Sequence, residues 1–450
     1  MKLPRRVFFI ALIVVLLIIP IPFILNKAPR KKEPVNVILI VVDTLRADQL
    51  GFMGGPNISP NIDRLSRDSI VFQNAISPAP WTSPAVGSIL TGRDPSALGF
   101  LSDEFSKLDR SVITLAEILK LSGYRSFGVV SHLLLETQFG FSQGFDSYDE
   151  SNSRGESHVS SESITEKAAG ILQNAGKPFL LFLHYFDPHF SYIMHDKYNY
   201  DKEYKGAIDN DTTVYEMRRM SPRMSQADVD HIWAKYRSEI SFTDEYIGKL
   251  LQTLKEMKLY DSSLIIFVGD HGESIRERKD GWIGHTQTLY QELVHVPLLI
   301  KLPGSEQGFS VSQYVSTKQI TPTIVDYLQL DVPENLDFGG MALNLERKTE
   351  QPMQPVMSET SRHAYLRSIV WNHWKLIYSP KTGDKMLFDL KSDPKESNNL
   401  ADIHSEMAKL LEQKLVDYYA KNDGSKGGAA GQAPDLTDRE KQILKSLGYF

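Results

Sequence analysis

Short, almost uninterrupted apolar runs recur along the chain, and longer stretches of mixed polarity separate them. Residues 35–42 are nearly all aliphatic, which is typical of a strand buried on both faces, as in a parallel sheet. The same pattern returns at residues 127–130, 179–183, 264–268 and 296–300. These five runs are therefore predicted to be buried strands.

Helical patterns lie between these strands. Thr114 and Glu117 have the spacing of a capping box, and apolar residues every three or four positions predict a helix over residues 236–258. Strands that alternate with helices indicate an α/β fold, a layered sheet with helices on both faces. Residues 191–230 show little periodicity and are interpreted as an insertion over the sheet and a candidate lid.

The last part of the chain changes character near residue 341. Short alternating strands at 368–371 and 374–378 predict a small antiparallel α+β subdomain. A Gly- and Lys-rich segment, 421–434, is expected to be flexible, and a terminal helix follows over 436–450. The predicted parts are an anchor with its linker, a central domain and this C-terminal subdomain, at residues 1–34, 35–340 and 341–450.

The first 34 residues differ from the rest. Residues 7–25 are uncharged and apolar, about long enough to cross a hydrocarbon core, and basic residues flank both ends. Because no small-residue cleavage site follows, we expect a single uncleaved helix that anchors the chain in a membrane. Positive charge on both sides leaves the orientation open.

Composition narrows the classes of function. With 450 residues, 41% of them hydrophobic, the chain is long enough for a sizeable core. The formal net charge of −6 argues against a nucleic-acid partner. The absence of cysteine excludes disulfides, thiolate metal ligands and a cysteine nucleophile.

Acidic and imidazole side chains follow two of the predicted strands. Asp43 comes directly after residues 35–42, and Asp270 and His271 come just after residues 264–268. Because ligands bind beyond the carboxyl ends of strands in open α/β sheets, we expect the three side chains to share a site. Carboxylates with an imidazole suit Zn²⁺ or Mn²⁺ better than Ca²⁺. The alternatives are a turn-capping Asp43 and a hydrogen-bonded loop pair.

A hydroxyl and several histidines add to this candidate site. Thr82 stands at the start of a predicted helix that Gly92 ends, where free N–H groups favour a tetrahedral anion such as phosphate or sulfate. A nearby cation would ease deprotonation of the hydroxyl, although the segment taken alone is better explained as a capped helix. His184, His189 and His285 could hold a substrate oxygen or protonate a leaving group, whereas a single histidine is more often structural.

Together these segments resemble the sulfatase family of the alkaline phosphatase superfamily, over nearly the whole chain after the anchor. The resemblance rests on an ordered set of motifs at residues 36–48, 59–65, 82–92, 123–125, 140–146, 184–189, 270–273, 288–297, 374–377, 387–394 and 447–449. It implies an alkaline-phosphatase-like α/β core and one divalent metal ion, Zn, Mn or Ca, beneath the nucleophile. The implied metal ligands are Asp43, Thr82, Asp270 and His271, the implied catalytic residues are Thr82, His189 and His285, and the implied substrate-binding residues are His132 and His184.

The nucleophile segment departs from the family pattern. Sulfatases carry a cysteine or serine that is oxidised to formylglycine, then a proline and an arginine, whereas here Thr82 and Pro84 keep the spacing and Val86 replaces the arginine. Threonine would yield a ketone instead of the aldehyde. The pattern is closer to threonine-nucleophile relatives, which include phosphodiesterases and phosphoethanolamine and phosphoglycerol transferases.

The resemblance therefore predicts a metal-dependent hydrolase of sulfate or phosphate esters in a glycan, a lipid or a small molecule. Because the family is mostly extracytoplasmic, we expect the catalytic domain outside the cytoplasm. One alternative is a phosphotransferase that acts on a lipid or glycan. Another is a catalytically inactive, sulfatase-like binding protein.

Overall fold

The computed structural model describes residues 34–101, 105–154, 160–332, 336, 338–346, 353–422, 431 and 433–449. The predicted membrane anchor at residues 7–25 lies outside this part of the chain, as does most of the segment 421–434, so both remain predictions. Among the described residues, no helix has the length and apolar character needed to cross a membrane.

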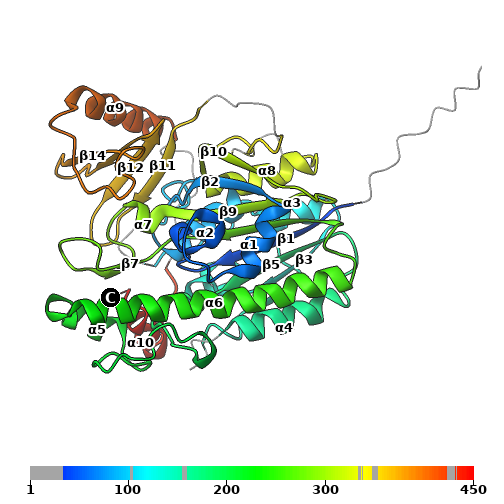
Figure 1. The fold of residues 1–450 in the computed structure, drawn as a ribbon. Coiled ribbons are helices and arrows are strands. Elements are labelled where there is room, and N and C mark those ends of the chain that lie inside the picture. Colours follow the sequence, from blue (N-terminus) through cyan, green and yellow to red (C-terminus); the bar gives the residue numbers. More distant parts are fainter. Residues whose placement is uncertain are drawn as a thin grey trace, which may run out of the picture. The chain divides into compact units, whose positions relative to one another are not determined.

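A mixed eight-stranded sheet forms the centre of the fold (Figure 1). Its strands, in spatial order, are β10 (Phe309–Ser316), β2 (Ile70–Ile76), β9 (His295–Lys301), β6 (Ser263–Gly269), β1 (Asn36–Val42), β5 (Phe179–Tyr185), β3 (Arg125–Val129) and β4 (Ser147–Asp149). All five predicted strands are present, as β1, β3, β5, β6 and β9. β9 runs antiparallel to both neighbours. Burial on two faces accounts for its apolar pattern but does not determine its direction, so the sequence could not predict this orientation.

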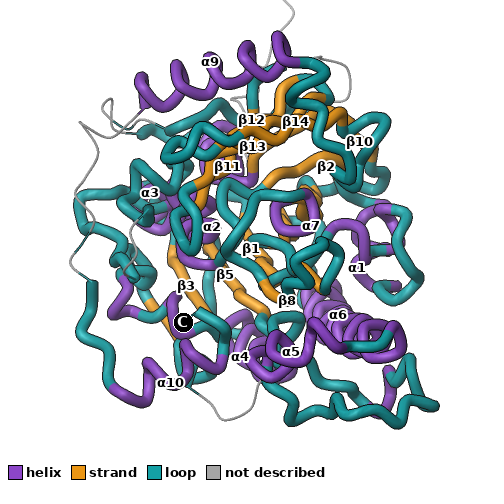
Figure 2. The backbone as a smooth tube through the Cα atoms, turned by 90° about the vertical axis from the view of Figure 1, so that its left-hand side faces the viewer, coloured by secondary structure: helices purple, strands orange, loops and turns teal. Residues whose placement is uncertain are grey.

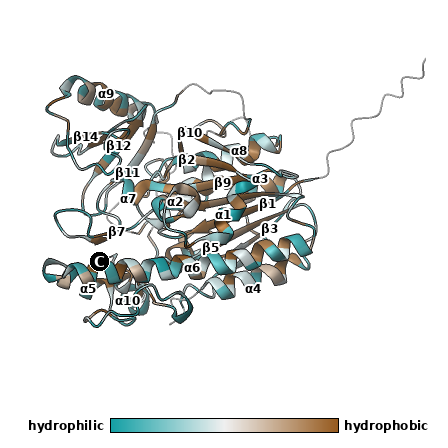
Figure 3. Cartoon of the chain, viewed as in Figure 1, coloured by the Kyte–Doolittle hydropathy of each residue, from teal (hydrophilic) through white to brown (hydrophobic). Residues whose placement is uncertain are grey.

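Helices cover both faces of this sheet, as predicted. The α-helices of the described residues are α1 (Pro60–Arg67), α2 (Thr82–Thr91), α3 (Leu115–Leu121), α4 (Ser161–Leu172), α5 (Val214–Met220), α6 (Gln226–Glu256), α7 (Gln291–Val294), α8 (Ile320–Tyr327), α9 (Ser405–Asn422) and α10 (Asp438–Ser446), of which α9 packs against the C-terminal sheet described below. Alternate residues of β1 enter two separate apolar clusters: Val37, Leu39 and Val41 face α2 and α3, and Ile38 and Ile40 face α4 and α6. Figure 3 shows apolar central strands and mixed polarity on α4 and α6.

The helix predicted over 236–258 begins ten residues earlier than expected. Ser225 and Asp228 form a capping box that starts α6 at Gln226, so α6 includes the end of the supposed insertion. The remaining residues, 191–225, hold only α5 and two short 3-10 helices, Asp196–Tyr198 and Ser221–Arg223. The capping box of Thr114 and Glu117 is present at α3, as predicted.

A second, four-stranded antiparallel sheet confirms the predicted C-terminal architecture. It comprises β11 (Val356–Thr360), β12 (Leu366–Trp371), β13 (Trp374–Tyr378) and β14 (Lys385–Asp389), and α9 packs against it. The predicted terminal helix is α10, which returns to the first sheet (Figure 2). There Leu444 and Leu447 join the larger apolar cluster. A two-stranded ribbon, β7 (Ser274–Ile275) and β8 (Ile283–Gly284), contacts α5 through β8 and α6 through β7.

Candidate active site and metal centre

The end of β1 fixes the position of Asp43. The next residue, Thr44, has a φ of 50°, a left-handed conformation that is strained for a β-branched side chain. Two contacts hold this turn: the Thr44 N–H donates to Asp270 Oδ1 at 3.1 Å, and the Tyr236 hydroxyl donates to the Thr44 carbonyl at 2.6 Å. The strain is therefore compensated by contacts that tie Asp43 to the end of β6.

Asp270 and His271 each direct one ligand atom toward Asp43. Asp270 Oδ1 accepts from the N–H groups of Thr44 and His271, at 3.1 and 2.7 Å. His271 Nδ1 lies 2.9 Å from the Gly272 carbonyl, so its proton sits there and Nε2 carries the lone pair. That Nε2 lies 3.4 Å from Asp43 Oδ1 and 3.6 Å from Asp270 Oδ2. A backbone partner that fixes the other nitrogen is typical of metal-binding histidines.

Thr82 completes the predicted set. It is the first residue of α2, and Trp81 precedes it without a side-chain cap, so the expected capped helix is not what the structure shows. Thr82 Oγ1 lies 3.4 Å from His271 Nε2. The four predicted metal ligands thus converge, and each is 0% exposed. Their individual roles remain predictions.

The buried donors suit a cation. Within the described part of the chain, neither oxygen of Asp43 nor Oδ2 of Asp270 accepts a well-formed hydrogen bond. Burial, followed by the Asp270 carboxylate, raises the pKa of Asp43 well above its ordinary value. Burial, followed by His285, lowers the pKa of His271, which favours the neutral ligand form. Bound positive charge would remove the cost of two adjacent buried carboxylates.

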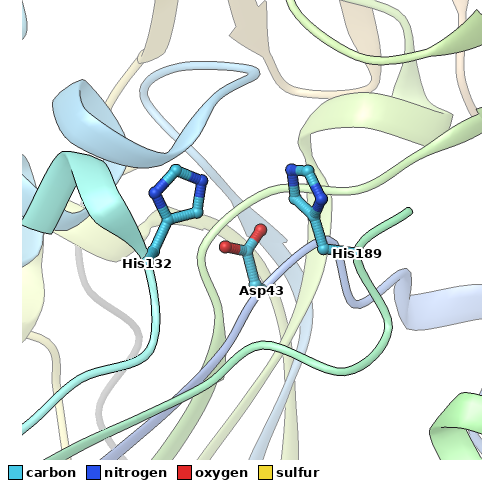
Figure 4. Close-up of side chains that lie close together, drawn as sticks. All are labelled: Asp43, His132 and His189. Atoms are coloured by element: carbon cyan, nitrogen blue, oxygen red, sulfur yellow. The ribbon is translucent and has the colours of Figure 1, made fainter. Parts of the chain in front are cut away.

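Two groups of side chains around Asp43 have ligand atoms within 4.8 Å of one another: Asp43, His184 and Asp270, and Asp43, His132 and His189. Figure 4 shows the second group, with the rings of His132 and His189 on either side of the Asp43 carboxylate. His184 was predicted to bind substrate, and its Nε2 lies 3.6 Å from Asp43 Oδ2, within reach of a cation shared with that carboxylate. Burial, with His271, lowers the pKa of His184 to about 3.

Local partners assign the protons of the other histidines. His132 Nδ1 accepts from the Leu134 N–H at 3.0 Å, so its neutral ring carries the proton on Nε2. His189 Nδ1 lies 2.8 Å from the Phe190 carbonyl, and His285 Nδ1 lies 3.1 Å from Glu273 Oε1. These two rings therefore present Nε2 lone pairs, while His132 presents an N–H.

Sequence reasoning gave no site role to two residues that the structure places here. Glu273 supports His285 and follows Asp270 and His271 directly, so its position in the Asp-His-Gly-Glu segment was an available signal. Tyr449 lies with its hydroxyl 3.2 Å from Thr82 Oγ1, and nothing local in its sequence indicates that contact.

Comparisons with known proteins identify the family of the chain. The model of the sulfatase family matches residues 35–330, and that of the N-sulphoglucosamine sulphohydrolase C-terminal region matches residues 280–421. An ulvan-active sulfatase of Formosa agariphila is 26% identical over 445 residues, covering 87% of this chain and 85% of the relative. A choline-sulfatase of Rhizobium meliloti is 24% identical over 430 residues, covering 82% of each protein.

Solved structures show the same fold. The phosphonate monoester hydrolase of Agrobacterium radiobacter has a TM-score of 0.72 at 20% identity, covering 86% of this chain and 96% of that one. A structure determined in complex with its substrate, D-glucosamine-2-N,6-O-disulfate, has a TM-score of 0.73 at 20% identity, covering 88% and 99%. Because the family model matches well over half of the sequence, the chain belongs to the sulfatase family of the alkaline phosphatase superfamily and is an ester hydrolase of that family.

Proposed function

We propose that the chain hydrolyses a sulfate or phosphate ester, with Thr82 as the nucleophile and a divalent cation held by Asp43, Asp270 and His271. The observation that carries the proposal is the convergence of a helix-terminal hydroxyl, two carboxylates and an imidazole in one fully buried site. Thr82 also lies at the first turn of α2, where the helix N–H groups favour a bound anion.

A cation at this site would lower the pKa of the Thr82 hydroxyl and neutralise negative charge on the ester. The donor set of carboxylate oxygens and an imidazole nitrogen favours Zn²⁺ or Mn²⁺. His184 is a further nitrogen donor within reach of Asp43 and Asp270.

The residues of the chain account for the remaining chemistry. Thr82 Oγ1 gives up its proton to His285 Nε2 and attacks the sulfur or phosphorus atom, the bond to the leaving oxygen breaks, that oxygen takes up the proton, and a covalent ester on Thr82 forms. The Nε2–H of His132 is proposed to orient a hydroxyl that contacts the transferred group. His285, whose Nε2 lone pair faces the site and whose Nδ1–H is held by Glu273, accepts the proton of the water that later hydrolyses the intermediate. His189 presents a second such nitrogen and is proposed to contact the leaving group.

The relatives guide the choice of substrate. Curated relatives matched over most of their length are named for sulfated compounds, ulvan and choline sulfate, so a sulfate ester is the first candidate. Thr82 specifically favours a phosphate ester as the second, because threonine cannot supply formylglycine, and the structurally similar phosphonate monoester hydrolase acts at phosphorus. We further propose that residues 7–25 anchor the enzyme in a membrane with its catalytic domain outside the cytoplasm.

The test uses the detergent-solubilised full-length chain, freed of metal and reloaded with Zn²⁺ or Mn²⁺. Turnover of aryl sulfate, aryl phosphate and bis-aryl phosphate is compared between wild type and Thr82→Ala, with Thr91→Ala at the other end of α2 as the matched control. We expect metal-dependent release of the aryl alcohol, lost in Thr82→Ala and retained in the control. Equal turnover in wild type and Thr82→Ala would refute the proposal, and turnover only with an added sugar or lipid acceptor would indicate a transferase.

A further inference from the structure

A side chain from the far end of the sequence lies in the centre of the site. The hydroxyl of Tyr449 is 3.2 Å from Thr82 Oγ1, 3.3 Å from His132 Nε2 and 3.4 Å from His285 Nε2. The side chain is buried, with 2% of its surface exposed. One phenol therefore contacts the proposed nucleophile and the two histidines that handle protons in the proposed reaction.

The histidine protons determine what this phenol can donate. Because the Leu134 N–H occupies His132 Nδ1, the Nε2–H of His132 donates to the Tyr449 oxygen. The hydroxyl proton of Tyr449 is then directed away from His132, towards Thr82 Oγ1 and the lone pair of His285 Nε2. Tyr449 thus offers a hydrogen-bond donor beside the attacking oxygen.

Contacts from several elements build this placement. Arg362 Nη2 donates to the Tyr449 carbonyl at 2.8 Å, and Arg218 Nη1, from α5, donates to the Gly448 carbonyl at 3.1 Å. Gly448 has a φ of +73°, and a Cβ there would lie 3.0 Å from Arg218 Nη1, so the turn that presents the tyrosine favours glycine. The tyrosine ring packs edge-on against Trp81, with centroids 6.3 Å apart. A segment that merely rested on the surface would not need these contacts.

We propose that Tyr449 is a substrate-contacting residue of the active site, whose hydroxyl donates a hydrogen bond to a non-bridging oxygen of the sulfuryl or phosphoryl group while Thr82 attacks. In-line attack leaves the non-bridging oxygens beside the nucleophile, where this phenol lies. A donor held in place in a water-excluded site stabilises the developing charge without reorganisation. The inference rests on the proposed function and adds a residue to it.

The experiment compares Tyr449→Phe with Tyr419→Phe, a buried tyrosine of α9 that packs against the second sheet, in the full-length, metal-loaded enzyme. The ring and its packing remain in both variants, so melting temperatures should stay close to wild type. With the best aryl ester, we expect kcat to fall roughly 100-fold in Tyr449→Phe, KM to change little, and Tyr419→Phe to behave as wild type. A kcat within twofold of wild type in Tyr449→Phe would overturn the inference.

Other variants separate a failure of the Tyr449 assignment from a failure of the proposed function. If Thr82→Ala is inactive while Tyr449→Phe is fully active, only the role of Tyr449 fails and the proposed function stands. If Tyr449→Ala turns over faster than wild type, the segment is a removable cover and the inference also fails. If Tyr449→Phe does not fold, 3-fluorotyrosine incorporated at position 449 can report ligand contact by fluorine NMR. Its resonance should shift when orthovanadate is added, and an unchanged resonance would overturn the inference.

Discussion

Replacing Asp43 with asparagine should separate the requirements of folding from those of cation binding. Asp43 is 0% exposed, and burial together with the Asp270 carboxylate raises its pKa well above the ordinary value of 3.8. In the metal-free protein, the stability that this group contributes is complete below pH 3.8 and is lost as the pH rises toward the folded-state pKa. At pH 7.5, metal-free Asp43→Asn should therefore be at least as stable as metal-free wild type.

Binding of the cation should reverse the order of stability, so that wild type becomes more stable than Asp43→Asn. A ligand present at 100 times its Kd stabilises the folded state by about 2.7 kcal/mol. The globular unit, residues 35–450, has an unfolding entropy of about 0.9 kcal/mol per kelvin at roughly 2.1 cal/mol/K per residue. Saturating Zn²⁺ or Mn²⁺ should thus raise the Tm of wild type by about 3 °C. Asp43→Asn should gain less than 1 °C, because it lacks a charged oxygen that lies 3.4 Å from His271 Nε2.

Differential scanning calorimetry of both proteins, with chelator and with saturating cation, measures the four values. Asp244→Asn is the matched control, since Asp244 is also buried but accepts from the N–H groups of Asn61 and Ile62 at the start of α1. That variant should lose stability and keep the full metal-induced shift. A metal-induced shift of wild-type size in Asp43→Asn would refute the assignment of Asp43 as a ligand.

Three further predictions follow from buried or capping groups. Burial, with Asp94, raises the pKa of Glu359 from 4.5 to about 7, so the wild-type protein loses stability as the pH rises through that range. In urea unfolding, the stability of Glu359→Gln relative to wild type should therefore increase by roughly 2.5 kcal/mol between pH 5 and pH 8, and a difference that does not change with pH would contradict this. Glu273→Gln should lower kcat by roughly 10- to 100-fold at nearly unchanged Tm, because an amide can also donate to His285 Nδ1 and so no longer fixes the tautomer of that ring; unchanged kinetics would exclude that role. Thr114→Ala should cost about 1 kcal/mol in urea unfolding, because the N-cap of α3 is lost.

Much of the sheet was predictable because burial on both faces produces a simple apolar pattern. β1 shows this clearly, since consecutive residues from Val37 to Val42 enter opposite clusters and each of these positions is therefore apolar. β2 and β10 escaped prediction because polar residues interrupt them, such as Gln73 and Asn74 in β2. The apolar pattern could not predict the direction of a strand, as the antiparallel β9 illustrates.

The predicted site residues share a different kind of signal. Asp43, Asp270 and His184 lie at the ends of strands of one sheet, so the strand pattern alone brings them together. Tyr449 has no such signal, because its position depends on Arg218, which is 230 residues away from Gly448, and on Arg362. Contacts of that range follow from the complete fold and not from any local pattern.

Val86 illustrates how a departure from the sulfatase sequence pattern affects the chemistry of the site. The resemblance to sulfatases implies an arginine at that position, whereas Val86 is 0% exposed and packs in the larger apolar cluster. The helix that presents Thr82 therefore contributes N–H groups to the site but no formal positive charge. In the proposed mechanism, the charge on a bound ester is met by the cation, by the Tyr449 hydroxyl, and by guanidinium groups from distant elements, since Arg218 and Arg362 both act electrostatically on His285. In the proposed mechanism, the threonine nucleophile and the valine at position 86 therefore belong together, because the cation would both activate the Thr82 hydroxyl and balance the charge of the bound ester.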